Sequence, residues 1–158
     1  MPRASSSRTT TPRLRNFAAL WEGHPAVCGE MYPCVSADGS PHFENQCAIR
    51  MGLALERAGI SLADYPGARC WHGHNHVIRA QELADWMRQR KDLFGQVEVR
   101  RKARAEHFAG RRGIVFFRDF WGAGNRGDHI DVWDGTKMGC GDNSYFERSR
   151  EVWFWPIP

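Results

Sequence analysis

The spacing of the apolar residues changes near residue 113, and this change constrains the fold more than any other feature of the chain. Before it, segments carry apolar residues at helical spacing; after it, short runs of β-branched and aromatic residues alternate with turns. Helices followed by antiparallel strands are typical of an α+β architecture. The sequence therefore predicts an α+β fold, and a length of 158 residues suits one hydrophobic core.

Four segments of the first part are predicted to be helices. They cover residues 14–22, 45–58, 79–90 and 98–109. The second is the clearest, because Asn45 is a favourable N-cap and Gly59 supplies a C-terminal stop. The fourth is strongly basic and ends at Gly110. The many prolines and glycines of residues 23–43 predict a loop there, and residues 60–76 are also irregular.

Three runs rich in β-branched and aromatic residues predict the strands of the second part. They cover residues 114–117, 129–133 and 151–155. Asp134-Gly135 directly follows the second run and is typical of a hairpin turn. A glycine-rich connection over 121–127 precedes the same run. The second strand is therefore expected to form one arm of an antiparallel hairpin.

The first 13 residues have the composition of a flexible arm, since they are rich in arginine, serine, threonine and proline and contain no acid. We expect a basic tail over 1–13 and a single domain over 14–158. Such a start also resembles an organelle transit peptide, although a plain disordered tail is commoner. No apolar segment follows the tail and no run is long enough to span a bilayer, so neither a secretory signal nor a membrane partner is expected.

The positive charge is concentrated in two segments. The formal net charge is +4, of which residues 1–15 carry +4 and residues 88–112 carry +6, while the remainder carries −6. Phe94 and Phe108 lie near the bases of the second segment, as in a module that stacks single-stranded nucleic acid. The uneven distribution favours an exposed helix face instead. Nucleic acid is therefore not expected as a partner. The alternative function is a basic nucleic-acid-binding module that uses residues 88–112.

Cys47 lies in the first turn of the clearest predicted helix. A helix N-terminus carries partial positive charge and unpaired N–H groups, which favour a nucleophilic thiolate and can hold an oxyanion. Gln46 can add a side-chain amide donor, and Asn45 caps the same turn. Asn45, Gln46 and Cys47 are therefore candidates for the nucleophile and its oxyanion donors. The structural alternative is a small buried thiol on an apolar helix face.

A nucleophilic cysteine needs a base that a third group orients, and His129 is the candidate base because it opens a strand after a glycine-rich loop. Asp131 shares its strand face, and Asp142 comes from the return side of the hairpin. A turn centred on Asp134-Gly135 puts residue 140 opposite His129, and a small irregularity there would bring Asp142 beside the ring. We favour Asp142, which would meet the ring edge-on, and keep Asp131 as the alternative.

A second group of polar side chains lies over residues 70–76. Cys70, His72, His74 and His76 occupy alternate positions and would share one face of an extended strand. Structural zinc sites usually combine two separated ligand pairs, so this spacing favours hydrogen bonding and cleft lining, with Trp71 as a candidate substrate contact. A metal-binding module here is the alternative. The sequence leaves open whether Cys28, Cys34, Cys70 and Cys140 form disulfides.

Seven short motifs follow one another in a specific order. They are ENQCAIRM (44–51), RCW (69–71), RAQELA (79–84), RGIVFF (112–117), DHIDVWDG (128–135), SYF (144–146) and VWFW (152–155). In this order the chain resembles the family 4 amidase effectors of type VI secretion, which are papain-like enzymes of the NlpC type, over roughly residues 14–155. This family commonly has Gly-His where the chain has Asp128-His129.

The resemblance implies a papain-like fold of the NlpC type, with N-terminal helices that carry Cys47 packed on an antiparallel sheet that carries His129. It implies a cysteine amidase that cleaves the bond between γ-D-glutamate and meso-diaminopimelate in peptidoglycan. Cys47 would be the nucleophile, His129 the base and an acidic residue after the hairpin, Asp142, the orienting group. Neither a cofactor nor a metal is expected for this chemistry.

The resemblance also implies partners and a route. The expected partners are peptidoglycan stem peptides, a cognate periplasmic immunity protein and the type VI secretion machinery. The protein would be made in the cytoplasm without a signal peptide and exported by type VI secretion. It would then act in the periplasm of the target cell.

Overall fold

The computed structural model describes residues 13–158 except 44, 72–73 and 120–126, and in it helices precede a sheet. The helices are α1 (Phe17–Gly23), α2 (Cys47–Arg57), α3 (Ala80–Gln89), α4 (Lys91–Phe94), the 3₁₀ helix η1 (Ala105–Phe108) and α5 (Ser144–Arg148). The strands are β1 (Glu98–Arg100), β2 (Gly113–Arg118), β3 (His129–Trp133) and β4 (Glu151–Pro156). Residues 1–12 of the predicted tail and 121–126 of the glycine-rich connection lie outside the described residues.

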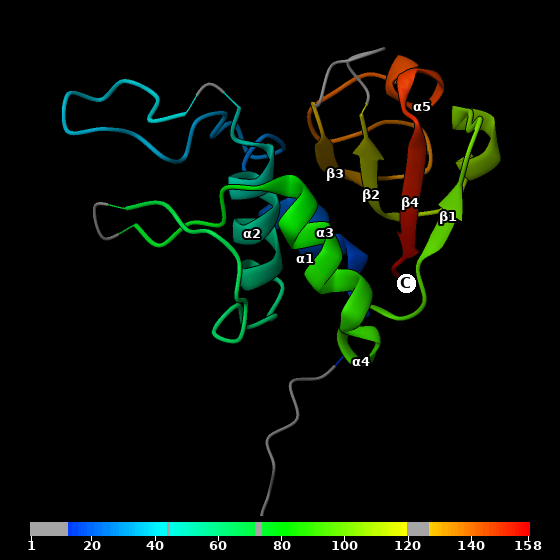
Figure 1. The fold of residues 1–158 in the computed structure, drawn as a ribbon, viewed down its shortest axis with the longest axis horizontal. Coiled ribbons are helices and arrows are strands. Elements are labelled where there is room, and N and C mark those ends of the chain that lie inside the picture. The colour runs from blue at the N-terminus through cyan, green and yellow to red at the C-terminus, as the bar shows by residue number, and fades with distance from the viewer. Residues whose placement is uncertain (1–12, 44, 72–73, 120–126) are drawn as a thin grey trace, which may run out of the picture.

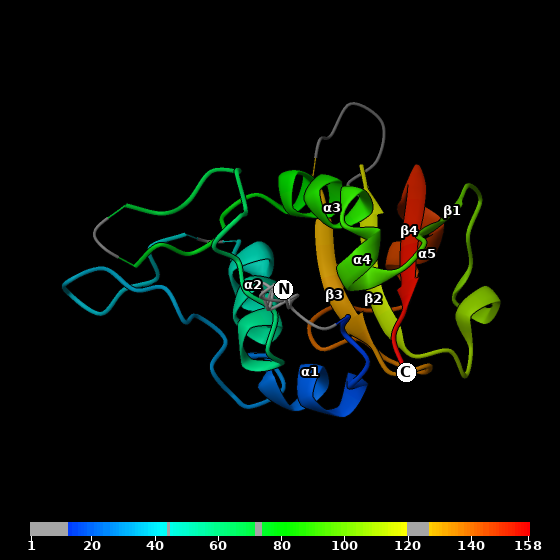
Figure 2. The ribbon, with the colours of Figure 1, turned by 90° about the horizontal axis from the view of Figure 1, so that it is seen from below.

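The described strands form a four-stranded antiparallel sheet in the order β1-β4-β2-β3. Figures 1 and 2 show α1, α2 and α3 on one side of it, with α2 nearest the edge strand β3. Successive side chains of β2 point to opposite faces, so Ile114 and Phe116 pack into the helix–sheet core while Val115 and Phe117 pack into a second core beneath η1 and α5. Burial on both faces explains why β2 is almost wholly apolar.

Most of the predicted elements are confirmed. The helices expected over 14–22, 45–58 and 79–90 correspond to α1, α2 and α3, and the three expected strands correspond to β2, β3 and β4. The hairpin turn also forms, with the Asp134 carboxylate accepting hydrogen bonds from the N–H groups of Thr136 and Lys137. The α+β prediction is therefore correct.

The helix predicted over 98–109 is wrong. Residues of β1 pair instead with β4, with Glu98 opposite Phe154 and Arg100 opposite Val152. β1 is an edge strand, and charged side chains are common there because they discourage further pairing. Arg111 binds Glu98 with Nη1 3.0 Å from Oε2, so part of the basic segment stabilises this edge.

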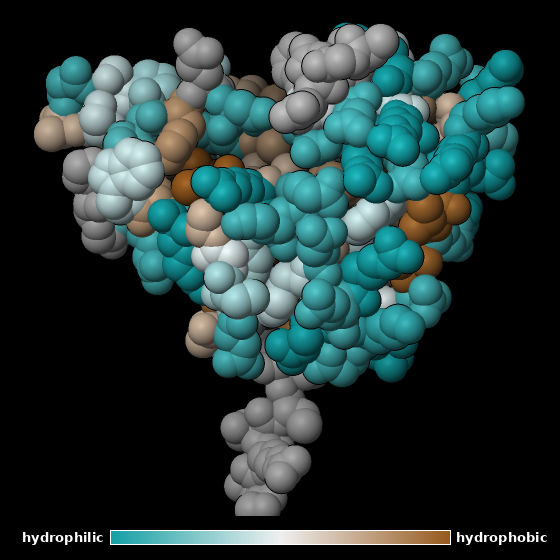
Figure 3. Space-filling model, in the orientation of Figure 1, coloured by the Kyte–Doolittle hydropathy of each residue, from teal (hydrophilic) through white to brown (hydrophobic). Residues whose placement is uncertain are grey.

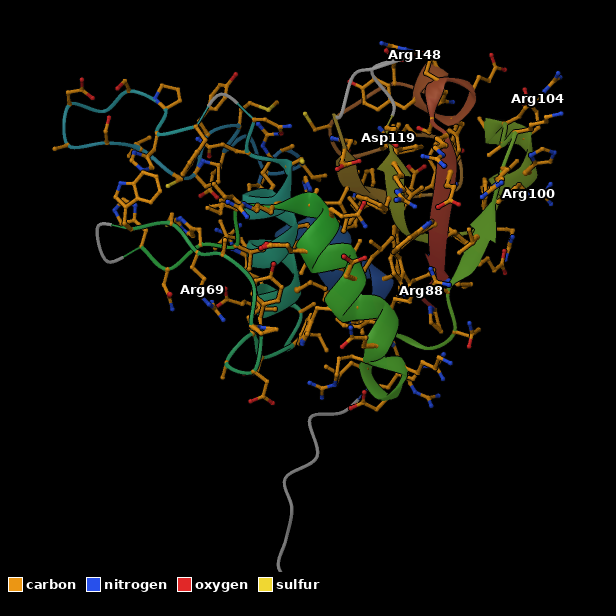
Figure 4. The ribbon with its side chains drawn as sticks, in the orientation of Figure 1. Arg69, Arg88, Arg100, Arg104, Asp119 and Arg148 are labelled. Carbon is orange, nitrogen blue, oxygen red and sulfur yellow. The ribbon has the colours of Figure 1, made fainter. Side chains whose placement is uncertain are left out.

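Other bases of segment 88–112 also have structural contacts. Arg88 lies over the Trp153 ring, and Arg111 over the Phe154 ring, at 4.9 and 5.0 Å from the ring centroids. Arg100 and Arg104 point outward from β1 and the turn before η1, and Arg88 lies between α3 and β4 (Figure 4). The surface over these elements is largely hydrophilic (Figure 3). Among the described residues, no helix has the length and apolar character needed to cross a bilayer.

Two long loops extend from α2 on the side away from the sheet (Figure 1). The first, over 24–46, contains a bridge between Val35 and Pro41; the second, over 58–79, contains a bridge between Arg69 and Val77. Both predicted loops are confirmed. Their buried cysteines, Cys34 and Cys70, belong to one small apolar cluster with Ile49 of α2.

Candidate active site

The first residues of α2 and β3 lie at the same end of the molecule, and these are Cys47 and His129 (Figure 1). The apolar face of α2 packs against the sheet through Ala48, Met51 and Leu55, which anchors the first helical turn beside β3. The Cys47 thiol is within hydrogen-bonding reach of the His129 ring. The two residues are only 4% and 7% exposed. The fold therefore brings together the predicted nucleophile and base.

Asp131 is the carboxylate that contacts the histidine. Its Oδ2 lies 2.8 Å from His129 Nε2, which leaves Nδ1 available to the Cys47 thiol. The carboxylate is fully buried and accepts backbone N–H bonds from Val132 and Gly139 at Oδ1 and from Cys140 at Oδ2. These donors compensate the buried negative charge and fix its orientation.

Asp142 does not occupy the position predicted for it beside the ring. It is exposed, and its Oδ1 accepts hydrogen bonds from the Ser144 N–H, at 2.8 Å, and from the Ser144 hydroxyl. The hairpin ladder reaches Gly139, whose N–H is shared between the Val132 carbonyl and Asp131 Oδ1, and the next N–H, that of Cys140, binds Asp131 Oδ2. The chain then turns into α5 and carries Asp142 away from the sheet.

The contacts of His129 favour its charged form. Burial lowers the pKa of His129, but the hydrogen bonds and charges of Asp131 and Cys47 outweigh burial and raise that pKa to about 10. The ring is thus an imidazolium at neutral pH, which stabilises a neighbouring thiolate. Phe117 stacks on the ring with centroids 6.1 Å apart, and Tyr145 meets it edge-on at 5.3 Å, so the ring plane is held from two sides.

His24 is a buried neighbour of Asp131 that the sequence interpretation missed. Its Nδ1 accepts a hydrogen bond from the Ala26 N–H, so Nε2 carries the proton and faces Asp131 Oδ1 at 3.6 Å. Burial lowers the pKa of His24 to about 4, against the opposing effect of Asp131, and the ring is therefore neutral. A lone histidine in a predicted loop carries no signal for this position, because only the tertiary fold brings it there.

Arg50 is the second residue missed. It lies one turn after Cys47 on the apolar face of α2 and is 6% exposed. Its Nε donates to the Met31 carbonyl at 2.7 Å, and its Nη1 lies 3.5 Å from Cys140 Sγ. The signal was present, since an arginine within an apolar helical face is rarely buried without a specific partner.

The predicted oxyanion donors have different contacts from those expected. The Gln46 side chain is buried, and its Nε2 donates to the carbonyls of Cys34 and Phe43, at 2.8 and 3.1 Å. Gln46 therefore anchors the first loop rather than offering a free amide. The helix begins one residue later than predicted, and the exposed Asn45 side chain accepts the Cys47 N–H at 3.1 Å. Oxyanion binding at this N–H requires Asn45 to rotate away.

Trp71 and Asp128 both lie close to the start of α2. Trp71 is 58% exposed, and its ring meets His42 and Phe43 edge-on at centroid distances of 5.3 and 5.8 Å. Phe43 belongs to the segment that leads into α2, so the indole lies on the approach to that helix. The Asp128 side chain accepts the Asp119 N–H, while its carbonyl oxygen lies 3.9 Å from Cys47 Sγ. The residue before His129 thus contacts the thiol through its backbone.

The cysteines are unpaired, and some of them group with histidines. All five thiols are free, including Cys28 and Cys140. Cys70, His74 and His76 lie together, as their spacing suggested, but the residue that joins them is Cys34 of the first loop. His72, the other histidine of the predicted cluster, lies outside the described residues.

Gly139 leaves no room for a side chain beside Asp131. A Cβ atom there would lie 2.9 Å from Asp131 Oδ1 and 3.1 Å from His24 Nδ1. If the Cys47–His129–Asp131 group is catalytic, Gly139→Ala should displace the carboxylate and lower kcat/KM for amide cleavage by about 10- to 100-fold. Gly52→Ala is the control, because its Cβ would meet atoms at an ordinary 3.5 Å. Equal kcat/KM values for the two variants would contradict the positioning role of Asp131.

Comparisons with known proteins found one matching family and several similar solved structures. A family model of the type VI secretion system (T6SS) amidase effector protein 4 matches residues 43–155. The crystal structure of the type VI effector Tae4 from Enterobacter cloacae superposes with a TM-score of 0.66 at 19% identity, covering 94% of this chain and 100% of that one. No curated protein matches the chain.

Structures of effectors solved together with immunity proteins are also similar to this chain. The effector Tae4 from Salmonella typhimurium, solved in complex with the immunity Tai4 from Enterobacter cloacae, has a TM-score of 0.67 at 20% identity over 92% of this chain and 100% of that one. The Tae4–Tai4 complex from Enterobacter cloacae has a TM-score of 0.66 at 20% identity over 92% and 99%. These similarities establish a common fold, which is the expected papain-like NlpC type.

Proposed function

The chain belongs to the amidase effector protein 4 family of the type VI secretion system, and from this premise we propose that it cleaves a peptidoglycan amide by cysteine catalysis. The observation that carries the proposal is the contact of His129 with a thiol at a helix N-terminus on one side and a buried carboxylate on the other. A nucleophile, a base and an orienting group in this relation are what acyl transfer requires. The proposed catalytic domain is 14–158, with 1–13 as a flexible tail.

The proposed reaction begins with attack of the Cys47 thiolate on the amide carbonyl. N–H groups of the first turn of α2 hold the oxyanion, and Asn45 releases the Cys47 N–H as the substrate enters. The His129 imidazolium then protonates the leaving amine from Nδ1, which gives a thioester on Cys47 and neutral imidazole. Water, deprotonated by His129, hydrolyses the thioester and restores the thiolate–imidazolium pair.

Asp131 takes the third role in this mechanism, in place of Asp142. Its hydrogen bond holds Nδ1 toward the thiol and stabilises the imidazolium. His24 supports Asp131 from the opposite side, with a neutral ring that adds no competing charge. Trp71 is proposed as a substrate contact because it is an exposed aromatic residue near the segment that enters α2.

The proposed substrate is the stem peptide of peptidoglycan, at the amide between γ-D-glutamate and meso-diaminopimelate. As an effector of type VI secretion, the protein would act in the periplasm of the target cell. A producing cell would need an immunity protein against it, as the complexes of the Salmonella and Enterobacter effectors with Tai4 suggest.

Mass spectrometry of purified peptidoglycan fragments after digestion tests the reaction class and the bond together. The expected products are a glycan that retains L-Ala-D-Glu and a released peptide with a free amine on diaminopimelate. Cleavage at another amide would contradict the proposed bond. Release of sugars without any new amine would contradict the amidase itself.

A further inference from the structure

The two loops beside α2 meet at four side chains that the proposed catalysis does not use. Cys34 comes from the first loop, and Cys70, His74 and His76 come from the second. One ligand atom of each residue lies within 4.8 Å of those of the other three. Figure 1 shows the two loops on the side of α2 away from the sheet, and Arg69, the neighbour of Cys70, marks the second loop in Figure 4.

The composition of this group fits zinc. Two thiolates and two imidazoles form one of the usual tetrahedral donor sets of structural zinc sites. Zinc bonds of about 2.3 Å to sulfur and 2.0 Å to nitrogen put neighbouring ligand atoms about 3.3 to 3.8 Å apart. Cys34 Sγ and His74 Nδ1 are already 3.6 Å apart. Small side-chain rotations would therefore close the group on one ion.

The backbone around the cluster is already ordered. Within the second loop, the bridge between Arg69 and Val77 and the hydrogen bond from the Cys70 N–H to the His76 carbonyl hold residues 69–70 beside residues 76–77. The Cys34 N–H and carbonyl are both bound by the buried Gln46 amide, at 2.9 and 2.8 Å. Ligands held in this way lose little conformational freedom when a metal binds.

Two contacts in the cluster suit a bound metal ion. His76 Nδ1 is buried and has no hydrogen-bond partner in the described part of the chain. Cys70 Sγ accepts the His76 N–H at 3.1 Å, an outer contact suited to a metal-bound thiolate. A lone pair buried without a donor is costly, and a metal ion would use it.

We propose that Cys34, Cys70, His74 and His76 bind one Zn²⁺ ion, which joins the two loops beside α2. Four protein ligands leave no open position, so the site is structural and not catalytic. Gln46 links it to the nucleophile, because its side chain holds Cys34 and its backbone directly precedes Cys47. The proposal does not depend on the identity of the amide that the enzyme cleaves.

The main competing arrangement is a disulfide between Cys34 and Cys70, which an oxidising periplasm would allow. A disulfide would account for the two thiols but would leave the two histidines and the buried His76 Nδ1 without a role. Metal content and thiol count distinguish the two arrangements, since zinc binding keeps both thiols reduced.

The test uses the full chain without a histidine tag, carrying Cys47→Ala so that the catalytic thiol cannot bind metal. After reduction, incubation with Zn²⁺ and desalting, elemental analysis should find about one zinc per chain. Adding Cys34→Ser or Cys70→Ser should abolish this zinc, whereas Cys28→Ser should retain it, because Cys28 is an exposed thiol outside the cluster. Equal zinc content in all these proteins would overturn the proposal.

Cobalt gives a readout that does not depend on how the variants fold. The Cys47→Ala protein with all four cluster residues intact, loaded with Co²⁺, should show the intense visible bands of tetrahedral cobalt and a thiolate charge-transfer band. Chelation should lower Tm, and added Zn²⁺ should restore it. Absence of thiolate-bound cobalt, or a Cys34–Cys70 disulfide that forms in the presence of Zn²⁺, would refute the metal site whatever the amidase activity.

Discussion

The Cys47→Ala variant is expected to lose at least about 10⁴-fold of the wild-type rate of peptidoglycan amide cleavage, because it lacks the thiol that forms the proposed thioester. Its fold should be retained, since the change removes one sulfur atom and alanine is the best helix former. Release of new amines from purified peptidoglycan measures the rate, and thermal unfolding followed by circular dichroism measures the stability.

Cys28→Ala is the matched control for this result. It makes the same chemical change at an exposed thiol outside the proposed site, and it should leave both the rate and Tm close to wild type. Substantial cleavage by a folded Cys47→Ala protein would exclude cysteine catalysis. A loss of activity in Cys28→Ala as large as in Cys47→Ala would show instead that thiol removal acts through stability.

The places of Cys47 and His129 could be predicted because each depends on local patterns. An N-cap before an apolar helical face locates the first turn of α2, and a glycine-rich loop before an alternating run locates the start of β3. Their contact then follows from packing a helix against the strand at the sheet edge. The catalytic roles assigned to them stay a prediction until the variants are measured.

The sequence could not decide whether Asp131 or Asp142 contacts His129, because the answer depends on where a hairpin stops. Spacing alone suggests that the return strand continues to Asp142. In the structure, the Gly139 N–H is shared between the Val132 carbonyl and Asp131 Oδ1, and the next N–H, that of Cys140, binds Asp131 Oδ2. Asp131, the alternative candidate on the same strand face, meets the ring instead, because His129 Nε2 lies 2.8 Å from Asp131 Oδ2.

Long-range contacts explain the remaining differences. Segment 98–109 carries charges that suit either a helix or an edge strand. Residues 98–100 form a strand because they pair with β4. His24 and Cys34 belong to an irregular loop whose path has no periodic signal. Their neighbours, Asp131 and Cys70, are distant in sequence, so only the fold reveals that each pair belongs together.

The Asp131→Asn variant is expected to lower kcat/KM for amide cleavage by about 10²- to 10⁴-fold, as when the aspartate of other nucleophile–histidine–aspartate enzymes is changed. An amide cannot supply the negative charge that stabilises the imidazolium. The NH₂ group of the asparagine would also face backbone N–H donors that now bind a carboxylate oxygen, and this would lower the free energy of unfolding by about 1 to 3 kcal/mol. Asp142→Asn is the matched variant, and it should change kcat/KM by less than about threefold, because Asp142 is exposed and bound to Ser144.

The pH profile separates a positioning role from a loss of stability. Asp131 and Cys47 raise the pKa of His129 to about 10 against the effect of burial, so the imidazolium and its stabilising contacts persist at neutral pH and are lost as the pH rises through that value. Removing the carboxylate charge lowers the His129 pKa. The basic limb of kcat/KM should therefore move to lower pH in Asp131→Asn and stay in place in Asp142→Asn.

Measuring kcat/KM at several pH values, at a temperature where each variant is fully folded, checks this shift. If Asp131→Asn loses activity by the same factor at every pH, the carboxylate does not set the pKa of His129, and its proposed stabilisation of the imidazolium is wrong. If Asp142→Asn loses activity and Asp131→Asn does not, then the return segment must reach His129 when substrate binds, and Asp142 is the orienting residue after all. A shifted basic limb in Asp131→Asn alone is the result expected if β3 supplies both the base and the group that holds it.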